Sequence, residues 1–382
     1  MEPPEPHPVP FNRPTVGPRG LQNVAAALAG HHLAGDGPYT ARCVDLLAEA
    51  LGGAPSLLTP SCTHALEMAA LLLEVGPGDE VLMPSFTFVS TANAFVLRGA
   101  TPVFVDVDPR TGNLDPDDLA RRVTPAARAV VVVHYAGVAC DMARIGDIAD
   151  RNGLVVVEDN AHGLFGTWRG RPLGTLGSLA TLSFHETKNV TCGEGGALVL
   201  NDPSLVARAE IIREKGTNRS QFIRGEVNRY AWMDIGSSYL LSDVLAGLLA
   251  AQLEEADAIQ TARERAWKQY SAALGGWAEE HGVALPFIPD DCESAWHSFH
   301  LLLPGRDARD RLIDHLRARG IGAPFHYLPL HLSEMGRRLG GREGDCPVTE
   351  DLSGRLIRLP LRHSLTDEDV AAVVAGVEAF VP

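Results

Sequence analysis

The sequence has no long apolar run, no surplus of positive charge and no paired cysteines, and each absence excludes a class of protein. A membrane-spanning helix needs roughly 18 consecutive apolar residues, and no run in this chain approaches that length. Lysine and arginine total 33 against 48 aspartate and glutamate residues, which gives a net charge of −15. We therefore expect no membrane and no nucleic-acid polymer as partners, because polymer binding depends on cations that neutralise phosphates. A small nucleotide ligand stays open, since a few local cations or a helix N-terminus can bind it.

The six cysteines are scattered along the chain without any Cys-x-x-Cys pair. This spacing predicts neither a disulfide framework nor a zinc site. The first ten residues are rich in proline and have no basic start and no apolar stretch, which is unlike a signal peptide. We expect residues 1–20 to form an N-terminal arm and the protein to be cytoplasmic.

From about residue 56, short apolar runs alternate with segments of helical periodicity. Runs such as 130–133 are apolar on both faces, which is typical of a strand covered by helices on both sides. Strands separated by helices predict an α/β fold with a mainly parallel, doubly wound sheet, whose ligands bind at the carboxyl ends of the strands. The strands are expected at Ser56–Thr59, Glu80–Met83, Pro102–Val105, Ala129–Val133, Leu154–Val157, Thr181–Phe184 and Ala197–Leu200. The helices between them are expected at His64–Glu74, Val89–Leu97, Asp117–Val123 and Met142–Asn152.

The rest of the chain predicts a polar connection and a smaller α/β unit. The polar stretch Gly216–Ser238 is typical of a long functional loop. After it we expect a long helix at Leu253–Glu280, strands at 299–303 and 325–328, and helices at 307–319 and 367–380. A chain of 382 residues exceeds what one core usually organises. We therefore place a large domain over residues 1–250 and a small C-terminal domain over residues 251–382.

Polar side chains follow several of the predicted strands. Ser61, Cys62 and Thr63 join a strand to a helix, where hydroxyl and N–H groups can bind a phosphate, although simple helix capping explains the same residues. Asp159 ends a buried strand, where a carboxylate either caps the next segment or needs a cationic partner. The sequence therefore predicts a polar site at this edge of the sheet.

Lys188 is the most informative of these residues. It lies just beyond a predicted strand, and the glycines of Gly193–Gly196, which allow close backbone approach, follow it. Lysine amines form Schiff bases with carbonyl cofactors and substrates. A phosphate site, a carboxylate, a stacking aromatic and such a lysine together are what pyridoxal 5'-phosphate requires.

Other cofactors fit the sequence less well. No Gly-x-Gly-x-x-Gly follows the first predicted strand, which disfavours an NAD-type sugar reductase, and no phosphate-binding Gly-x-x-x-x-Gly-Lys-Ser/Thr is present. The spacing of His297 with His300, or of His326 with His331, matches no dedicated metal site. We expect no metal.

Long stretches of the chain resemble the DegT/StrS-type nucleotide-sugar aminotransferases, which are fold-type I pyridoxal phosphate enzymes. The resemblance is strongest to the branch that makes dTDP-4-amino-4,6-dideoxygalactose. It implies a large, mainly parallel-sheet domain with helices on both faces and a smaller C-terminal α/β domain. It extends from Pro10–Pro14 to Arg358–Leu361, and the segments that carry it are Leu58–Thr63, Met83–Asn93, His134–Cys140, Ser183–Asn189, Lys215–Phe222 and Asp234–Tyr239.

The resemblance also implies a role for each matching residue. Lys188 would hold the cofactor as a Schiff base and, once freed, act as a general base, while Asp159 would pair with the pyridine nitrogen. The other implied cofactor contacts are Phe88 (stacking on the ring), Cys62, Thr63 and Ser183 (phosphate), His162 (phenolic oxygen) and Ser238 (phosphate across a dimer). The implied substrate contacts are His134, Arg219, Phe325, His326, Tyr327 and His331.

Two positions depart from the family pattern. Most members have glutamine in place of His162 and asparagine in place of Ser238, and the shorter serine would need a water to reach a phosphate. A related dehydratase branch replaces the lysine with histidine. This chain keeps Lys188, which favours a transaminase.

The activity that the resemblance implies is amino transfer from L-glutamate onto the C4 ketone of a dTDP-4-keto-6-deoxyhexose (dTDP-4-dehydro-6-deoxy-glucose). The partners expected are this keto sugar, L-glutamate and a second copy of the chain, in a homodimer or dimer of dimers with shared active sites. Two alternatives stay open: the same reaction on another keto position or nucleotide sugar, and a non-catalytic regulatory protein that binds pyridoxal phosphate.

Overall fold

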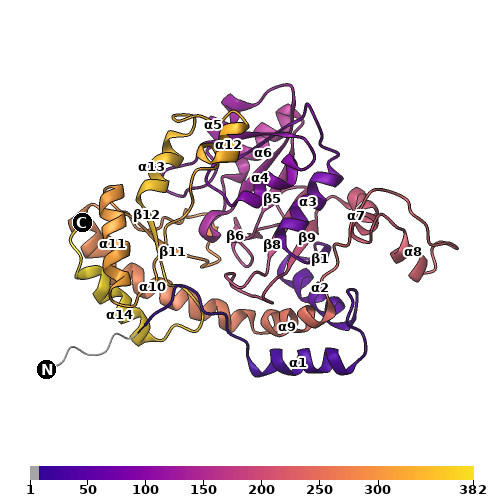
Figure 1. Ribbon diagram of the computed structural model, residues 1–382, viewed down its shortest axis with the longest axis horizontal. Coiled ribbons are helices and arrows are strands. Elements are labelled where there is room, and N and C mark those ends of the chain that lie inside the picture. Colours follow the sequence, from indigo (N-terminus) through magenta and orange to yellow (C-terminus); the bar gives the residue numbers. More distant parts are fainter. Residues whose placement is uncertain (1–7) are drawn as a thin grey trace.

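The computed structural model describes residues 8–382 and is built around a seven-stranded sheet (Figure 1). The strand order is β1-β9-β8-β5-β4-β2-β3. Neighbouring strands from β8 to β3 pair in parallel, whereas β9 runs antiparallel to both β1 and β8. The mainly parallel sheet is confirmed, and its one reversed strand brings the β8–β9 connection to the carboxyl edge. The seven strands are β1 Ser56–Thr59, β2 Glu80–Pro84, β3 Thr101–Val105, β4 Ala127–Val133, β5 Val155–Asp159, β8 Leu179–Ser183 and β9 Gly196–Leu200.

Two smaller sheets lie outside the main one. The three-stranded sheet has the order β10-β6-β7, and the two-stranded sheet pairs β11 with β12. Their strands are β6 Thr167–Trp168, β7 Arg171–Pro172, β10 Cys292–Glu293, β11 Phe299–Leu302 and β12 Leu356–Leu359. The strand predicted at 325–328 is wrong: Phe325 makes only an isolated bridge to Ile357, and β12 takes the place beside β11. The prolines at 324 and 329 flank this aromatic segment, and proline cannot donate to a strand ladder.

The helices flank the sheet and form much of the C-terminal part of the chain (Figure 1). The helix predicted at 253–280 is two helices, because Glu255 leaves helical geometry between α9 and α10. The boundary proposed near residue 250 falls within α9. The α-helices are α1 Pro18–Ala29, α2 Pro38–Ala50, α3 Cys62–Leu72, α4 Val89–Val96, α5 Pro116–Arg122, α6 Met142–Asn152, α7 Val206–Arg213, α8 Arg219–Ile223, α9 Asp243–Glu254, α10 Ala256–His281, α11 Arg306–Arg317, α12 Glu334–Arg338, α13 Pro347–Arg355 and α14 Asp367–Glu378. Short 3-10 helices are η1 Tyr135–Gly137, η2 Pro203–Leu205 and η3 Leu330–Leu332.

Strand β4 shows why the apolar runs form a sheet with helices on both faces. Alternate side chains of a strand point to opposite faces. Ala129 and Val131 belong to the apolar cluster that includes α3, whereas Val130 and Val132 belong to the cluster that includes α6. A strand buried on both sides is therefore continuously apolar, as its sequence is.

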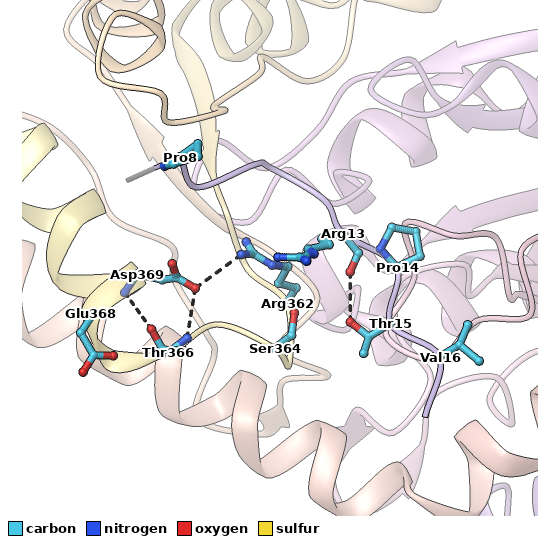
Figure 2. A pocket seen from close by; sticks show the side chains of 10 residues that line it. All are labelled: Pro8, Arg13, Pro14, Thr15, Val16, Arg362, Ser364, Thr366, Glu368 and Asp369. Carbon is cyan, nitrogen blue, oxygen red and sulfur yellow. Dashed lines mark hydrogen bonds and ion pairs between the residues drawn. The ribbon is translucent and has the colours of Figure 1, made fainter. Parts of the chain in front are cut away.

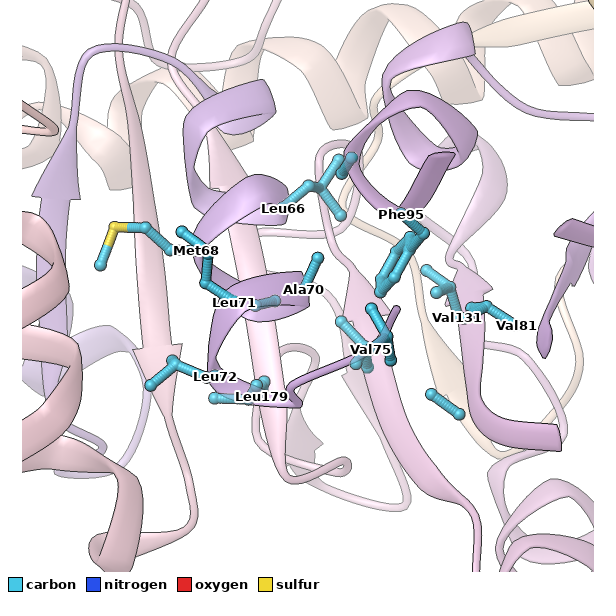
Figure 3. Close-up of a cluster of buried hydrophobic side chains, with 14 of the residues drawn as sticks. Leu66, Met68, Ala70, Leu71, Leu72, Val75, Val81, Phe95, Val131 and Leu179 are labelled. Atoms are coloured by element: carbon cyan, nitrogen blue, oxygen red, sulfur yellow. The ribbon is translucent and has the colours of Figure 1, made fainter. Parts of the chain in front are cut away.

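Helix α3 is fixed to the sheet by its apolar side chains (Figure 3). Leu66 and Leu72 of the helix lie in one buried cluster with Phe95, Val131 and Leu179. Burial of a leucine side chain contributes about 1.5–3 kcal/mol. This packing holds the N-terminus of α3, with Cys62, next to the carboxyl end of β1.

A separate apolar cluster lies in the C-terminal part of the chain. It joins α10, the β11–β12 sheet, α11 and α14 around side chains such as Tyr270, Phe299 and Leu312, and Val9 of the N-terminal segment is part of it. This cluster supports our proposal of a small C-terminal domain. Of the predicted arm, residues 1–7 lie outside the described residues and Pro18 begins α1. No helix within residues 8–382 is long and apolar enough to cross a membrane.

Candidate active site

Lys188 lies in the connection between β8 and β9, and hydrogen bonds fix the backbone on both sides of it. Its own N–H donates to the His185 carbonyl at 2.9 Å, and His185 bridges to Gly193. The next residue, Asn189, is buried and donates to the Ala295 carbonyl at 2.6 Å. Within residues 8–382 the Lys188 amine itself has no hydrogen bond or ion pair. The fold therefore holds the base of this side chain and leaves its Nζ available.

The surroundings of Lys188 favour a neutral amine. Burial lowers the pKa of Lys188 to about 8; Cys62 and Asp159 oppose this shift, and the Arg358 guanidinium adds to it. A lysine with this pKa is partly deprotonated near neutral pH, so it can act as a nucleophile and as a base.

Asp159 ends β5 in a buried position that Thr91 supports. Thr91 Oγ1 donates to Asp159 Oδ2 at 2.7 Å and is itself bonded to the Thr87 hydroxyl at 2.8 Å. Burial raises the pKa of Asp159, whereas the bond from Thr91 and the charge of Lys188 lower it. No role for Thr91 follows from the sequence alone, although its spacing of four residues from Thr87, which lies just before α4, is compatible with their contact.

The N-terminus of α3 forms a cradle beside β9. Ser61 caps the helix by accepting from the His64 N–H at 3.2 Å, so the capping interpretation holds for Ser61. The Thr63 hydroxyl instead bonds to that of Ser90 at 2.8 Å. A side chain at Gly196 would place its Cβ 2.4 Å from the Cys62 nitrogen. The backbone therefore approaches the helix terminus closely enough only because residue 196 is glycine.

Cys62 and Ser183 border the same cradle. The Cys62 thiol donates to Thr181 Oγ1 at 3.4 Å, and burial raises the pKa of this thiol, so it stays protonated. Ser183 is the last residue of β8 and pairs with Gly196 in the sheet. Both residues therefore lie where a phosphate at the α3 N-terminus would be bound.

His162 stacks on His297 in a buried position, with ring centroids 4.2 Å apart. His297 Nδ1 bonds to the Asn189 side-chain oxygen at 2.9 Å, which connects this stack to the residue after Lys188. Burial lowers the pKa of His162 well below its usual value, so the ring is neutral. Its Nδ1 is buried without a hydrogen-bond partner. A polar atom in this state points to a missing ligand.

The segment that was predicted as a strand supplies two side chains to this site. Tyr327 lies with its hydroxyl 3.5 Å from His162 Nε2, and His326 Nδ1 bonds to the Tyr135 hydroxyl at 3.1 Å. Phe325 is exposed and lies under the Arg309 guanidinium. His326 and Tyr327 are therefore placed to contact a substrate.

His134 and His331, which were expected to line a sugar pocket, are instead fully buried. His134 Nε2 bonds to Glu158 at 2.8 Å and its Nδ1 accepts from the Cys140 N–H at 3.2 Å. Burial acts to lower the pKa of His134, but the hydrogen bonds with Cys140 and Glu158 raise it. Because Nδ1 accepts from an N–H, the ring proton lies on Nε2, which donates to Glu158. We correct the role of His134 to support of the strand ends.

The correction for His331 has the same physical reason. Its Nδ1 bonds to the Ser85 hydroxyl at 2.6 Å and its Nε2 to Glu350 at 2.9 Å. Both ring nitrogens are occupied, so neither can bind a sugar hydroxyl without losing a buried bond. His331 therefore connects Ser85, which follows β2, to Glu350 of α13.

Three predicted site residues interact with parts of the chain other than Lys188: Arg219, Ser238 and Phe88. Arg219 pairs with the buried Glu214 at 3.3 Å, and Ser238 is exposed in a bridge opposite Glu214. Phe88 precedes α4 and is 57% exposed. Within the described chain none of the three forms a hydrogen bond or ion pair with Lys188, so their predicted roles stay predictions.

A cavity of about 680 Å³ lies in another part of the molecule (Figure 2). It is formed between the N-terminal segment and the start of α14, and Arg13, Arg362 and Thr366 line it. Arg362 is paired there with Asp369 at 3.5 Å. None of the candidate site residues lines this cavity, so the candidate site rests on the groups around Lys188.

Comparison with known proteins agrees with this geometry. Residues 14–378 match the model of the DegT/DnrJ/EryC1/StrS aminotransferase family. The chain belongs to this family. It is 33% identical to the spore coat polysaccharide biosynthesis protein SpsC of Bacillus subtilis over 98% of this chain and 97% of that protein.

Solved structures of this aminotransferase family extend the agreement to the fold. The aminotransferase TlmJ of Streptoalloteichus hindustanus superposes with a TM-score of 0.88 at 33% identity, over 97% of this chain and 98% of that one. The PMP-form of Spr1654 from Streptococcus pneumoniae superposes with a TM-score of 0.91 at 25% identity, over 97% and 98%. The α/β architecture of PLP-dependent aminotransferases is confirmed.

The residues of this aminotransferase fit pyridoxal phosphate. The Lys188 amine has no partner within the described residues, His162 Nδ1 is buried without one, and the Gly196 backbone leaves the α3 N-terminus open. Lys188 would hold the aldehyde, Asp159 the ring nitrogen, and Cys62, Thr63 and Ser183 the phosphate.

A substitution at Gly196 tests the cradle. We predict that Gly196→Ala lowers the melting temperature, since overpacking costs about 1–3 kcal/mol, and weakens cofactor binding at least tenfold because the α3 N-terminus is displaced. Thermal unfolding and titration with pyridoxal phosphate measure the two effects. Gly276→Ala in α10 is the control, because nothing lies within 4 Å of the added Cβ. Equal cofactor affinity in the two variants would contradict the cradle.

Proposed function

We propose that this sugar aminotransferase moves the amino group of L-glutamate onto the C4 ketone of a dTDP-4-keto-6-deoxyhexose and releases the dTDP-4-amino-4,6-dideoxyhexose. The observation that carries the proposal is that Lys188, whose amine has a lowered pKa and no partner within the described residues, and the buried Asp159 lie at the same edge of the sheet. The substrate is inferred from the sequence resemblance to the dTDP-sugar branch of the family.

Each residue has a separate task in this reaction. Bound pyridoxal phosphate supplies the aldehyde that carries the amino group and the ring that takes up the electrons of the breaking C–H bond. Asp159 would keep a proton on the ring nitrogen through its charge, and the hydrogen bond from Thr91 favours the ionised form of Asp159 by lowering its pKa against the effect of burial. Lys188 Nζ, once released, accepts the proton from the donor carbon and returns one to the acceptor carbon.

The side chains around Lys188 support a sugar as the acceptor. His326 and Tyr327, which are partly exposed, present an imidazole and a hydroxyl group on aromatic rings. Such rings can lie against the C–H face of a sugar while their polar atoms bond to its hydroxyls. Burial lowers the pKa of His326 well below its usual value, so a neutral imidazole would meet the sugar.

Incubation with L-glutamate and a panel of keto sugar nucleotides tests the proposed reaction. We expect turnover of the dTDP-4-keto-6-deoxyhexose and an amine at C4 in the product, identified by NMR. Lys188→Ala is the control: it should fold and bind the cofactor but lose at least 10³-fold in turnover. Amine at another carbon, or turnover of only another nucleotide sugar, would correct the substrate. No turnover with any keto sugar would favour a non-catalytic regulatory role.

We also propose that the protein is a homodimer whose segment 214–239 completes the partner's site. The segment exposes Phe222, Ile223 and Trp232, and Trp232 is 80% exposed. Leu97, which follows α4, and Phe88, which precedes it, are exposed as well. Exposed apolar side chains in such number are typical of a surface that another chain covers. In this arrangement Arg219 and Ser238 act in the site of the partner subunit, and assembly beyond the dimer stays open.

Mixed dimers test whether the site is shared. We predict that Lys188→Ala and Arg219→Ala subunits, each nearly inactive alone, recover about one quarter of wild-type activity when they exchange. Half of the random dimers are mixed, and each has one site that carries both defects and one that carries neither. A mixture of Lys188→Ala with Asp159→Asn is the control, since both of its mixed sites stay defective. Absence of recovery in the first mixture, with exchange demonstrated, would contradict a shared site.

A further inference from the structure

Arg358 lies beside the Lys188 site, and the proposed reaction assigns no task to it. It belongs to β12 and pairs directly with His300 of β11. Opposed residues of an antiparallel pair project from the same face. The His300 ring lies 5.9 Å from that of Tyr135, which also contacts His326. This face of the small sheet is therefore part of the substrate side of the site.

The guanidinium of Arg358 lacks an anionic partner. Its Nη2 donates to the Phe325 carbonyl at 3.3 Å, and it lies over the Phe11 ring at 4.6 Å. Its Nε is buried without any hydrogen-bond partner, as is Nδ1 of His300. No carboxylate within residues 8–382 forms an ion pair with it. Burying a cation without an anion is costly, so binding of an anionic group next to Arg358 would be favourable.

Other buried arginines of the chain differ from Arg358 in their partners or in their position. Arg213 pairs with Asp36 at 2.6 Å, and Arg309 pairs with Asp310 at 2.6 Å. Arg263 has no carboxylate but donates to the carbonyls of Trp296 and His297. Arg358 alone among these four combines an unpartnered buried nitrogen of its guanidinium with a position in the Lys188 site.

The charge of Arg358 acts on the groups at the reaction centre. It lowers the pKa of Lys188, after burial and against Asp159, and it contributes to the lowered pKa of His162 and of His326. These effects place the guanidinium within electrostatic reach of the Lys188 amine. An amino acid whose amine replaces the lysine would hold its carboxylate a few ångströms from that point, which is where Arg358 can meet it.

We propose that Arg358, with His300 beside it, binds a carboxylate of the amino donor and so determines that the donor is an amino acid. The inference rests on the proposed function. Arginine suits this task because its planar guanidinium presents two parallel N–H groups to a carboxylate. A keto sugar without a carboxylate leaves Arg358 unused, so the residue acts in only one half of the reaction.

The two half-reactions are measured separately in the cofactor-loaded enzyme, together with binding of glutarate, a dicarboxylate that carries no amine. We expect Arg358→Met to weaken glutarate and L-glutamate binding about 10- to 100-fold, the loss of a charge-assisted hydrogen bond. The loss in the reaction with the amino sugar should be much smaller, because that substrate presents no carboxylate to Arg358. Arg358→Lys should restore part of the glutarate affinity. Arg355→Met is the control, because Arg355 pairs with Asp351 on α13.

Unchanged glutarate affinity in Arg358→Met, with a melting temperature equal to that of Arg355→Met, would overturn the proposal. A defect in the amino-sugar half-reaction alone would also overturn it, because the carboxylate that Arg358 binds would then belong to the sugar. If the wild-type enzyme reacts with no amino donor, the proposed function fails, whereas the glutarate comparison still decides whether Arg358 binds a carboxylate.

Discussion

Lys188 and Asp159 lie at the same carboxyl edge of the sheet, yet they form no ion pair with each other in residues 8–382. Burial alone lowers the pKa of the amine and raises that of the carboxyl group. Pyridoxal phosphate bound between them would be held by Asp159 at its ring nitrogen and by Lys188 at its aldehyde, so that both buried groups would gain a partner. The rest of the site is arranged around this separation, since Thr91 holds the carboxylate and the β8–β9 connection holds the lysine.

The sheet topology brings Lys188 and Asp159 to the same edge of the sheet on two different strand ends. Asp159 ends β5, and β5 pairs in parallel with β8, so the residues that follow β8 emerge at the same edge. The antiparallel strand β9 then returns past Cys62, and Gly196 allows its backbone to approach α3. Asn189 ties the Lys188 connection to His297 and through it to His162. A site built on strand ends and a buried hydrogen-bond chain is rigid, which catalysis by positioned groups requires.

The sheet and the cofactor can be predicted from the sequence, whereas the predictions that were wrong have physical causes. Continuous apolar runs such as that of β4 predict a strand with two buried faces, and Lys188 with its glycines predicts the cofactor. His134 and His331 were misplaced because a histidine in a motif does not show whether its nitrogens are already bonded, and here Glu158 and Glu350 occupy them. The need of Arg358 for an anion depends on the partners that surround it, so only the folded chain reveals it.

The central claim is that Lys188 is the residue that holds the cofactor, and the composition of the chain makes it directly testable. The sequence contains three lysines, Lys188, Lys215 and Lys268. Lys215 and Lys268 are exposed and paired with Glu214 and Glu264. Borohydride reduction of the cofactor-loaded protein, followed by digestion and mass spectrometry, locates the bound group. The account predicts the pyridoxyl mass on the peptide that contains Lys188, whereas its presence on either of the other two lysines would contradict it.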